Sequence, residues 1–378
     1  MKTTYRLVAI PGDGVGPEVL RAGRTVLDAV GERFGFGLAW TEILLGGAAI
    51  DAYGLAVREE DIAACAQADA VYLGAVGGPK WDDPNASVRP EQGLLALRRE
   101  LVLFGNLRPV SVHPALASSA PLRPELLAGV DMMIVRELTG GLYFGQPSEE
   151  RSSPAGRFAM DTLPYSESEI ERVVRLAFEL ARGRRRKLTS VDKANVLATS
   201  RLWRKIVDEL RHEYPEVEVE HRLVDSTAMA LIRRPADFDV IVTENMFGDI
   251  LSDESSVLAG SLGMLPSASI GERTTAHGRH GLYEPIHGSA PHLTGRDLAN
   301  PIGTVLSGAM LLRWSLGLED AARAIEAAVA SALDDGFRTR DLLAPGERDA
   351  TPAANGGLTI VGTVGMTEAI LARIGPSA

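Results

Sequence analysis

Short apolar runs alternate with glycine- and proline-rich turns and with helical patterns along most of the chain. Tyr5–Ile10 is a β-type run that breaks at Pro11-Gly12-Asp13-Gly14, and Glu18–Phe34 then carries apolar residues at helical spacing. Similar apolar runs predict buried strands at Ala70–Ala75, Asp131–Arg136, Leu188–Val191 and Asp239–Thr243. Strands that alternate with helices are typical of an α/β protein with a parallel or mixed sheet. Ligands of such proteins bind beyond the carboxyl ends of the strands, where most of the unusual residues of this chain fall.

The later segments predict an arm and a helical end. Gly145–Pro164 is expected to leave the compact body as an arm. Ile302–Leu333 is rich in alanine and is predicted to be helical. Gly336–Leu343 and Gly356–Ile374 are predicted to be a loop and a closing helix. The sequence shows no internal repeat and no low-complexity linker.

The composition is that of a globular protein with two lobes. A chain of 378 residues is longer than most single domains, and its 45% hydrophobic and 24% charged residues exclude disorder as the main state. The net charge of −11 argues against nucleic acid as the main partner. The basic run Arg182–Lys187 contains no aromatic residue, so we interpret it as a solvated loop.

The sequence favours a cytoplasmic protein without membrane segments. No stretch approaches the roughly 18 uncharged apolar residues of a membrane span, and Leu7–Ile10 is too short for the apolar part of a targeting signal. The single cysteine, Cys65, excludes an internal disulfide framework and fits a reducing compartment. Because its neighbours are apolar, we expect Cys65 to pack rather than to react.

A glycine motif follows the first predicted strand. Gly12-Asp13-Gly14-Val15-Gly16-Pro17 begins like a dinucleotide-binding fingerprint between a strand and a helix. Its sixth position is Pro17, however, and no acidic residue closes a strand about 20 residues later in the expected way. Proline suits the first turn of a helix, so a tight strand-to-helix turn explains the glycines better than a Rossmann fold does.

Acidic residues gather at the start of a predicted helix that follows the strand ending at Thr243. Asp249 and Asp253 are four residues apart, so on a helix they share one face about 6 Å apart. Carboxylates without His or Cys suit a hard divalent cation such as Mg²⁺ or Mn²⁺, although a solvated helix start has the same pattern. Asp225 lies among apolar neighbours and is either a third ligand or the N-cap of a helix.

Arg98, Arg108 and Arg136 are candidates for binding an acidic substrate. Arg108 and Arg136 follow apolar runs at predicted strand ends, where packing rarely requires an arginine. Guanidinium groups bind carboxylates in a bidentate manner, so three convergent arginines suit a di- or tricarboxylic acid. Surface salt bridges explain the same spacing equally well.

Lys193 and Tyr143 are candidates for proton transfer. Lys193 lies between an apolar strand and an apolar helix start, where poor solvation favours the neutral amine that a general base requires. The alternative is an ion pair with the adjacent Asp192. Tyr143 follows Gly140-Gly141 and is either a proton donor or a packing residue.

The segment Glu284–His292 is a candidate phosphate-binding loop. Its small residues Gly288, Ser289 and Ala290 let a ligand approach the backbone, whose free N–H groups suit a phosphate. Any tight loop would use the same residues, so this pattern alone does not distinguish a phosphate site from an ordinary turn.

In combination these segments resemble the metal-dependent β-decarboxylating dehydrogenases over nearly the whole chain. The ordered motifs that carry the resemblance are IPGDGVGPEV, GAVGGPKWD, LRRELVLFGNLRP, RELTGGLYFG, TSVDKANVL, VDSTAM, ENMFGDILSDE, EPIHGSAPHLTGRDLANP and GFRTRDL. The resemblance implies an α/β, isocitrate/isopropylmalate dehydrogenase-like two-domain fold with a mixed sheet, not a Rossmann fold. The first domain would comprise residues 1–107 and 266–378, and residues 108–265 would form an inserted second domain with a dimerisation arm.

The resemblance also implies roles for single residues. Those that match the arginines binding the substrate carboxylates are Arg98, Arg108 and Arg136. Those that match the Mg²⁺ or Mn²⁺ ligands are Asp225, Asp249 and Asp253, and Asp225 is also expected to contact the substrate. Tyr143 matches the acid and Lys193 the base. Because Lys193 and Asp225 reach into the partner's site in this family, the resemblance implies a homodimer with shared active sites.

The cofactor implied is NAD, held by two loops. The residues expected to contact it are Gly77, Gly78, Pro79, Lys80, Trp81, Glu91, Glu284, His287, Gly288, Ser289, Ala290, Pro291, His292 and Asn300. NAD-using relatives carry an acid at the position of His292, and NADP-using relatives carry a lysine followed by a tyrosine. Here Leu293 follows His292, so we expect NAD to be the main cofactor, with weakened rejection of NADP.

The segment Glu91–Leu95 sets the substrate within the family. Relatives that act on isocitrate place polar residues here to bind a third carboxylate, whereas Leu94 and Leu95 offer an apolar wall to an isopropyl group. Together with GGPKWD this favours oxidative decarboxylation of 3-isopropylmalate, a step of leucine biosynthesis, over reactions of isocitrate, homoisocitrate or tartrate. A catalytically silent regulator that binds carboxylates or nucleotides is the alternative from another class.

Overall fold

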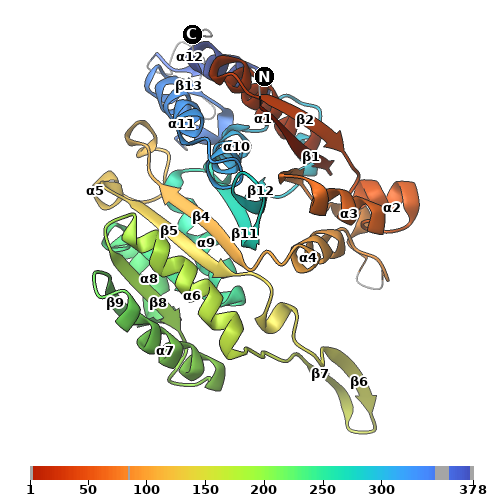
Figure 1. Cartoon of the computed structure of the whole chain (residues 1–378), viewed down its shortest axis with the longest axis vertical. Helices are drawn as coiled ribbons and strands as arrows, with labels where there is room; N and C mark the ends of the chain where they lie inside the picture. The colour runs from red at the N-terminus through yellow and green to blue at the C-terminus, as the bar shows by residue number, and fades with distance from the viewer. Residues whose placement is uncertain (1–2, 84–85, 345–356, 375–378) are drawn as a thin grey trace. The chain divides into compact units, whose positions relative to one another are not determined.

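The computed structural model describes residues 3–83, 86–344 and 357–374. The chain divides into two compact units, and both ends of the chain belong to the first (Figure 1). Unit 1 consists of Met1–Leu103, Val112–Pro124 and Ser256–Ala378. Unit 2 consists of Phe104–Ser111 and Glu125–Ser255.

Unit 1 is built on a mixed sheet with the strand order β2-β1-β3-β12-β11. These strands are β1 (Thr4–Gly12), β2 (Gly37–Glu42), β3 (Ala70–Ala75), β11 (Pro266–Thr274) and β12 (Arg279–Pro285). The helices of unit 1 are α1 (Gly16–Phe34), α2 (Gly47–Tyr53), α3 (Glu59–Gln67), α4 (Pro90–Glu100), α10 (Ile302–Trp314), α11 (Glu319–Asp334) and α12 (Thr363–Ile374). All neighbouring strands in this half run parallel except β11, which is antiparallel to β12.

Apolar residues on both faces of this sheet explain the two helical layers that cover it. Val8 of β1 belongs to an apolar cluster that also contains Cys65 of α3 and Leu97 of α4. Tyr72 of β3 contributes to the opposite layer, where its Oη donates to the carbonyl oxygen of Thr304 on α10 at 2.6 Å. Cys65 is fully buried, and burial raises the pKa of its thiol to about 12, so the predicted packing role is confirmed.

Within unit 2 the strands lie in the order β4-β5-β10-β8-β9. Its strands are β4 (Gly105–Ser111), β5 (Asp131–Glu137), β8 (Lys187–Asp192), β9 (Glu218–Leu223) and β10 (Val240–Thr243). Its helices are α5 (Pro124–Leu127), α6 (Glu167–Arg182), α7 (Ala198–Leu210), α8 (Val224–Arg233) and α9 (Asn245–Ser256). β4 is antiparallel to β5, and the remaining neighbours are parallel.

The predicted arm is a hairpin of unit 2. It consists of the antiparallel strands β6 (Glu149–Ser153) and β7 (Gly156–Met160). Figure 1 shows this hairpin extending away from α6 and from the short helix η3 (Gly141–Tyr143). Its residues are almost all exposed, including Phe158 at 54%.

The predicted domain limits stay a prediction, from which the compact units differ in three segments. Residues 104–107 belong to unit 2 because β4 pairs with β5 over its whole length. Val112–Pro124 belongs to unit 1, where the carbonyl oxygen of Ala115 accepts a hydrogen bond from Arg338 Nη2 at 2.9 Å. Unit 1 also resumes at residue 256 rather than at 266.

The helical character predicted for Ile302–Leu333 is confirmed, but it is divided between two helices, because α10 and α11 are separated by a turn in which Gly317 has a φ of +66°. Three other predictions need correction. The predicted loop Gly336–Leu343 contains the two-residue strand β13 (Phe337–Arg338) and a short helix, η9 (Arg340–Leu342). The predicted closing helix is shortened to α12, and Gly356 lies outside the described residues.

The third correction concerns the basic run Arg182–Lys187, which is not simply a solvated loop. It joins the end of α6 to β8, and its side chains bind nearby acids. Arg184 Nε lies 2.9 Å from Asp239 Oδ1, a carboxylate whose side chain is only 1% exposed. No helix within the described parts of the chain has the length and apolar character needed to cross a membrane.

Candidate active site

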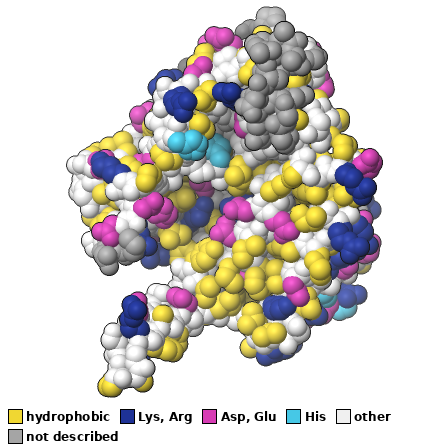
Figure 2. Space-filling model, turned by 180° about the vertical axis from the view of Figure 1, so that it is seen from behind, with side chains coloured by type: hydrophobic (Ala, Val, Ile, Leu, Met, Phe, Trp, Pro, Cys, Tyr) yellow, Lys and Arg dark blue, Asp and Glu magenta, His cyan; other side chains and the backbone are white. Residues whose placement is uncertain are grey.

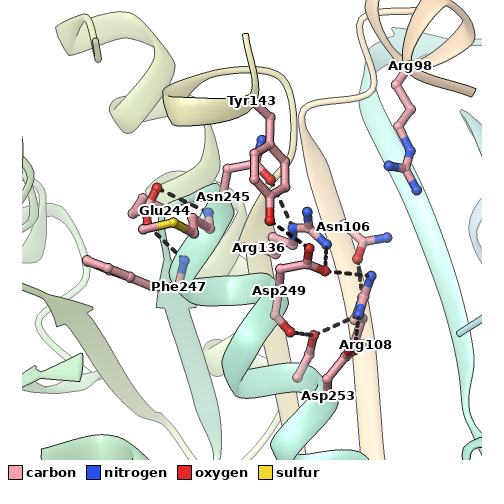
Figure 3. Close-up of polar contacts among 12 residues, drawn as sticks. Arg98, Asn106, Arg108, Arg136, Tyr143, Glu244, Asn245, Phe247, Asp249 and Asp253 are labelled. Atoms are coloured by element: carbon pink, nitrogen blue, oxygen red, sulfur yellow. Dashed lines mark hydrogen bonds and ion pairs between the residues drawn. The ribbon is translucent and has the colours of Figure 1, made fainter. Parts of the chain in front are cut away.

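Two predicted arginines and two predicted acids form one cluster in unit 2 (Figure 3). Arg108 on β4 and Arg136 on β5 are 8% and 3% exposed. Arg136 Nη1 donates to Asp249 Oδ1, and Arg108 Nη1 donates to Asp253 Oδ1 at 3.3 Å. The neighbouring strands thus point both guanidinium groups at one face of α9. The buried arginines explain how like charges four residues apart are tolerated on this helix.

Helix α9 carries Asp249 and Asp253, and its first turn is capped by Glu244. The carboxylate of Glu244 accepts hydrogen bonds from the backbone N–H groups of Phe247 at 2.8 Å and Met246 at 3.2 Å. Burial raises the pKa of Glu244. The side chains of Asp249 and Asp253, one turn apart, are 34% and 64% exposed, so solvent ions reach both carboxylates.

Tyr143 on η3 joins the same cluster. Its Oη donates to Asp249 Oδ2 at 2.9 Å, and 45% of the residue is exposed. Partial burial and the neighbouring charge of Asp249 raise the pKa of the phenol, so it keeps its proton at neutral pH. This half-exposed position suits a proton donor better than the packing alternative.

Lys193 and Asp225 form a second cluster within unit 2. Lys193 Nζ donates to Asp225 Oδ1 at 2.8 Å, and this contact lowers the pKa of the Asp225 carboxyl. The alternative pair with Asp192 is wrong, because the Asp192 carboxylate binds Arg204 at 2.8 and 2.9 Å. The N-cap alternative for Asp225 is also wrong, since the N-cap of α8 is Leu223.

The described residues of a single copy contain no group of three acids, histidines or cysteines that could hold a metal ion. Asp225 therefore does not join Asp249 and Asp253 within one described chain. Its assignment as the third ligand stays a prediction, together with its supply by a partner subunit.

The residues predicted to set substrate specificity lie on α4 of unit 1. Glu91, Leu94 or Leu95, and Arg98 are spaced so that they share one face of this helix. Arg98 Nη2 lies 2.9 Å from Glu284 Oε1, and both side chains are 12% exposed. The convergence of Arg98 with the arginines of unit 2 stays a prediction. Glu284, a predicted cofactor contact, serves here as the partner of Arg98.

The first predicted cofactor loop is held by Asp13, which sequence reasoning missed. Asp13 is 4% exposed, and its carboxylate accepts hydrogen bonds from the backbone N–H groups of Gly47 at 2.9 Å, Ala48 at 2.8 Å and Gly77 at 2.8 Å. The signal was an acid between two glycines directly after a strand.

Two further residues of this loop fasten it to α2. Lys80 Nζ and Trp81 Nε1 donate to the two carboxylate oxygens of Asp51 at 2.5 and 3.2 Å. In the sequence, Gly78 and Pro79 lie between Gly77 and the residues that bind Asp51. Residues 84 and 85 of the loop lie outside the described residues. The loop thus has a defined position from Gly77 to Trp81.

The second predicted cofactor loop rests on the glycine turn after β1. Val15 N donates to the carbonyl oxygen of Ser289 at 2.8 Å. A Cβ added at Gly14, where φ is +59°, would lie 2.0 Å from the same oxygen. Gly14 is therefore required by close packing, as the predicted tight turn implies. A Cβ at Gly288 would meet no atom within 4 Å, so the backbone there is open to a ligand.

His287 offers an unused acceptor in this loop. Its Nδ1 lies 2.9 Å from the carbonyl oxygen of Gly288 and donates to it, which leaves Nε2 as the acceptor. Nε2 is buried and has no hydrogen-bond partner among the described residues. Burial lowers the pKa of His287, so the ring is neutral and this nitrogen suits a hydroxyl or amine donor of a nucleotide.

The remaining residues of this loop differ in exposure. Pro291 and His292 lie on the exposed short helix η8 (Pro291–Leu293), which follows Ala290. Asn300 is buried, where its Oδ1 accepts from Ile302 N at 3.0 Å and its Nδ2 donates to Asp341 Oδ2 at 3.0 Å. Asn300 therefore fixes the start of α10.

The site combines two arginines that face two carboxylates, with the phenol of Tyr143 beside them. These features together define a class of protein. They indicate an enzyme that binds a small carboxylic acid together with a divalent cation. The family model described as isocitrate/isopropylmalate dehydrogenase matches residues 6–370. The chain belongs to this family, and the predicted fold class is confirmed.

Relatives and solved structures agree with this placement. The chain is 60% identical to a 3-isopropylmalate dehydrogenase of Anaeromyxobacter dehalogenans, with 89% of this chain and 94% of the relative covered. It is 57% identical to a 3-isopropylmalate dehydrogenase of Geobacillus kaustophilus, with 91% of each covered. The crystal structure of isocitrate dehydrogenase from Methylococcus capsulatus is 32% identical, with a TM-score of 0.83 over 98% of this chain and 99% of that chain.

Proposed function

We propose that this chain catalyses the NAD-dependent oxidative decarboxylation of (2R,3S)-3-isopropylmalate to 4-methyl-2-oxopentanoate. The observation that carries the proposal is the cluster of Arg108, Arg136, Tyr143, Asp249 and Asp253, in a chain 60% identical to a 3-isopropylmalate dehydrogenase. The reaction is a step of leucine biosynthesis. We place it in the cytoplasm, where a reducing environment keeps the lone Cys65 as a thiol.

The choice of 3-isopropylmalate depends on α4. Leu94 packs partly against the core cluster of unit 1, and Leu95 on the next position is half-buried. An apolar surface of this kind favours an isopropyl group over the third carboxylate of isocitrate, because a buried carboxylate needs a charged or hydrogen-bonding partner.

The residues present fit a divalent cation and NAD. Asp249 and Asp253 provide hard carboxylate oxygens that solvent ions reach, and Asp225 of the partner subunit would complete the set. The open backbone at Gly288 and the unused Nε2 of His287 fit a nucleotide. When bound, Mg²⁺ or Mn²⁺ supplies Lewis acidity at the C2 oxygen of the substrate, and NAD supplies the hydride acceptor.

The chain's own residues bind the substrate and move its protons. Arg108 and Arg136 bind the carboxylates and so orient C2 and C3. Lys193 leaves its ion pair with Asp225, loses one ammonium proton to solvent, and then accepts the proton of the C2 hydroxyl during oxidation to the ketone. The bond between C3 and its carboxylate then breaks with loss of CO₂, and Tyr143 donates its proton to C3 of the enolate. Its raised pKa keeps this proton available until the enolate forms.

We also propose that the protein is a homodimer with shared active sites. Met229 on α8 and Ile250 on α9 are 60% and 57% exposed, far more than is usual for residues of this size and polarity. Figure 2 shows hydrophobic side chains gathered on unit 2 beside the base of the arm. A second copy that covers this surface would bring its Lys193 and Asp225 to the acids of α9.

The proposed function is tested by initial rates of NAD reduction. The substrates are 3-isopropylmalate, isocitrate, malate and tartrate, each with Mg²⁺ and with excess chelator. We expect turnover that the chelator abolishes and that is confined to 3-isopropylmalate. Preference for isocitrate or tartrate would contradict the role given to Leu94 and Leu95. Absence of turnover with both NAD and NADP would overturn the proposal and favour the regulator alternative.

A further inference from the structure

Each of the two arginines of unit 2 makes a hydrogen bond to an asparagine side chain, which the binding of a carboxylate does not itself require. Arg136 Nε donates to Asn245 Oδ1 at 3.0 Å, and Arg108 Nε donates to Asn106 Oδ1 at 2.7 Å. Both asparagines are fully buried. Each amide oxygen holds one edge of a guanidinium group, while the Nη atoms are directed at the acids of α9.

Asn245 makes a second contact on its other side. Its Nδ2 donates to the carbonyl oxygen of Gly140 at 3.0 Å, and Gly140 directly precedes η3, which carries Tyr143. Tyr143 Oη in turn donates to Asp249 Oδ2 at 2.9 Å, and Asp249 Oδ1 accepts from Arg136. Asn245 thereby closes a ring of contacts that contains both the arginine and the phenol. Figure 3 shows the part of this ring made by Asn245, Arg136, Asp249 and Tyr143.

Only an amide satisfies both neighbours of this side chain. Arg136 Nε is a donor and the carbonyl oxygen of Gly140 is an acceptor, so Oδ1 must face the first and Nδ2 the second. The backbone of Asn245 is also fixed, because its N–H donates to Tyr165 Oη at 3.1 Å. Tyr165 Oη donates to Glu137 Oε2 at 3.0 Å, a carboxylate that is fully buried. A carboxylate in place of the amide would lack the donor, and an alkyl group would lack both atoms.

We propose that Asn245 is a positioning residue that sets the orientation of Arg136 and the place of Tyr143 together. This inference rests on the proposed function, in which Arg136 binds a substrate carboxylate and Tyr143 protonates C3. Asn106 holds Arg108 in a comparable way, but it lies on β4 and outside the ring that includes Tyr143. Asn106 is therefore expected to affect substrate binding alone, and Asn245 to affect both substrate binding and the protonation of C3.

The experiment measures KM and kcat for 3-isopropylmalate, and also the stereochemistry of protonation. Turnover in D₂O, with the product trapped at once by borohydride, shows which hydrogen position at C3 receives deuterium. The wild-type protein places deuterium at one position, because a fixed phenol delivers it from one side. Asn245→Ala raises KM about tenfold, since an oriented hydrogen bond to a charged group is lost, and it places deuterium at both positions.

Asn245→Asp separates the two contacts of this side chain. It retains an acceptor for Arg136 but directs an oxygen at the Gly140 carbonyl. We therefore expect a KM within about threefold of the wild-type value, together with mixed labelling at C3. Because this variant keeps the shape of the side chain, it also decides the question if Asn245→Ala fails to fold.

Two controls separate positioning from stability. Thr243→Val removes a buried hydrogen bond of 2.9 Å to the Val191 carbonyl oxygen, close in sequence to Asn245, and should lower thermal stability alone. Asn106→Ala should raise KM while leaving the label at one position. If both Asn245 variants keep the wild-type KM and labelling and lose only stability, the inference is overturned. Wild-type protein without turnover would overturn the proposed function as well.

Discussion

Lys193 lies in an ion pair that contributes little to the fold, so its substitution isolates its chemistry. Its Nζ contacts Asp225 Oδ1 at 2.8 Å, but 62% of the Asp225 side chain is exposed, where such pairs add little stability. Lys193→Ala should lower kcat by at least about 100-fold through loss of the base. Metal affinity and substrate affinity, measured by calorimetry, should stay close to wild type.

Lys205→Ala is the matched control for this variant, since Lys205 is 73% exposed on α7 and has no assigned role. Turnover of Lys193→Ala within about tenfold of wild type would show that Lys193 is not the base.

We predict that His292, on exposed η8, sets the preference between the two nicotinamide cofactors. Its imidazole would accept a hydrogen bond from only one ribose hydroxyl. His292→Asp should raise the ratio of kcat/KM for NAD over NADP about tenfold, because a carboxylate accepts from two hydroxyls and repels the phosphate.

Calorimetry with both cofactors checks the same ratio in binding alone. His212→Asp, the same change of charge on exposed η4 (Arg211–Glu213) of unit 2, should leave the ratio unchanged. A higher kcat/KM with NADP in the unaltered protein would contradict the assignment.

For individual residues, sequence motifs predicted the groups that react but not the residues that position those groups. Arg136 and Asp249 stand in motifs that carry recognisable chemistry, so both were predicted as site residues. Asp13 and Asn245 act through backbone N–H groups, a carbonyl oxygen and an arginine edge, and these partners lie up to 109 residues away in sequence. Contacts between residues so far apart in sequence cannot be deduced from the spacing of residues along the chain.

Among the elements, those with a strong local pattern were predicted best. The predicted strand Ala70–Ala75 has the same first and last residue as β3, because an uncharged run of this length between turn residues is typical of a buried strand. The break between α10 and α11 was missed, since the alanine-rich pattern continues across it and only Gly317 marks the turn. Burial of α10 on all sides also removes the periodicity that would have marked its ends.

Helix α4 carries a prediction about substrate choice, because two adjacent leucines differ in their surroundings. Leu94 packs against the core cluster of unit 1, whereas Leu95 is half-buried and is not part of that cluster. Leu95→Ser should lower kcat/KM for 3-isopropylmalate by about tenfold or more, because an apolar contact with the isopropyl group is lost. The melting temperature should change little.

Leu94→Ser is the comparison, and it should lower the melting temperature through loss of core packing. Initial rates with 3-isopropylmalate and malate measure the effect, since malate lacks the isopropyl group and should be affected least by Leu95→Ser. An equal loss with both substrates would argue against an isopropyl contact at Leu95.

For the whole molecule, the question is whether one chain holds a complete site. The arginines, Tyr143 and two acids form one cluster in unit 2, while Lys193 pairs with Asp225 in another. A homodimer with shared sites would unite the two clusters from different copies. The order of motifs in the sequence places all of these residues in one chain and so does not distinguish the two arrangements.

Mixing two inactive variants distinguishes these arrangements directly. Lys193→Ala removes the base and Asp249→Asn removes a metal ligand, so each homodimer should be nearly inactive. If Lys193 serves the site of the other copy, a mixed dimer has one site with both residues intact and one site with neither. Random reassociation of equal amounts then restores about a quarter of the wild-type activity, since half of the dimers are mixed and half of their sites are intact. If Lys193 serves its own copy, every site in every dimer carries one defect, and mixing restores nothing. Native mass spectrometry, with an affinity tag on one of the two variants, shows that mixed dimers have formed, so that absence of recovery would then refute the shared site.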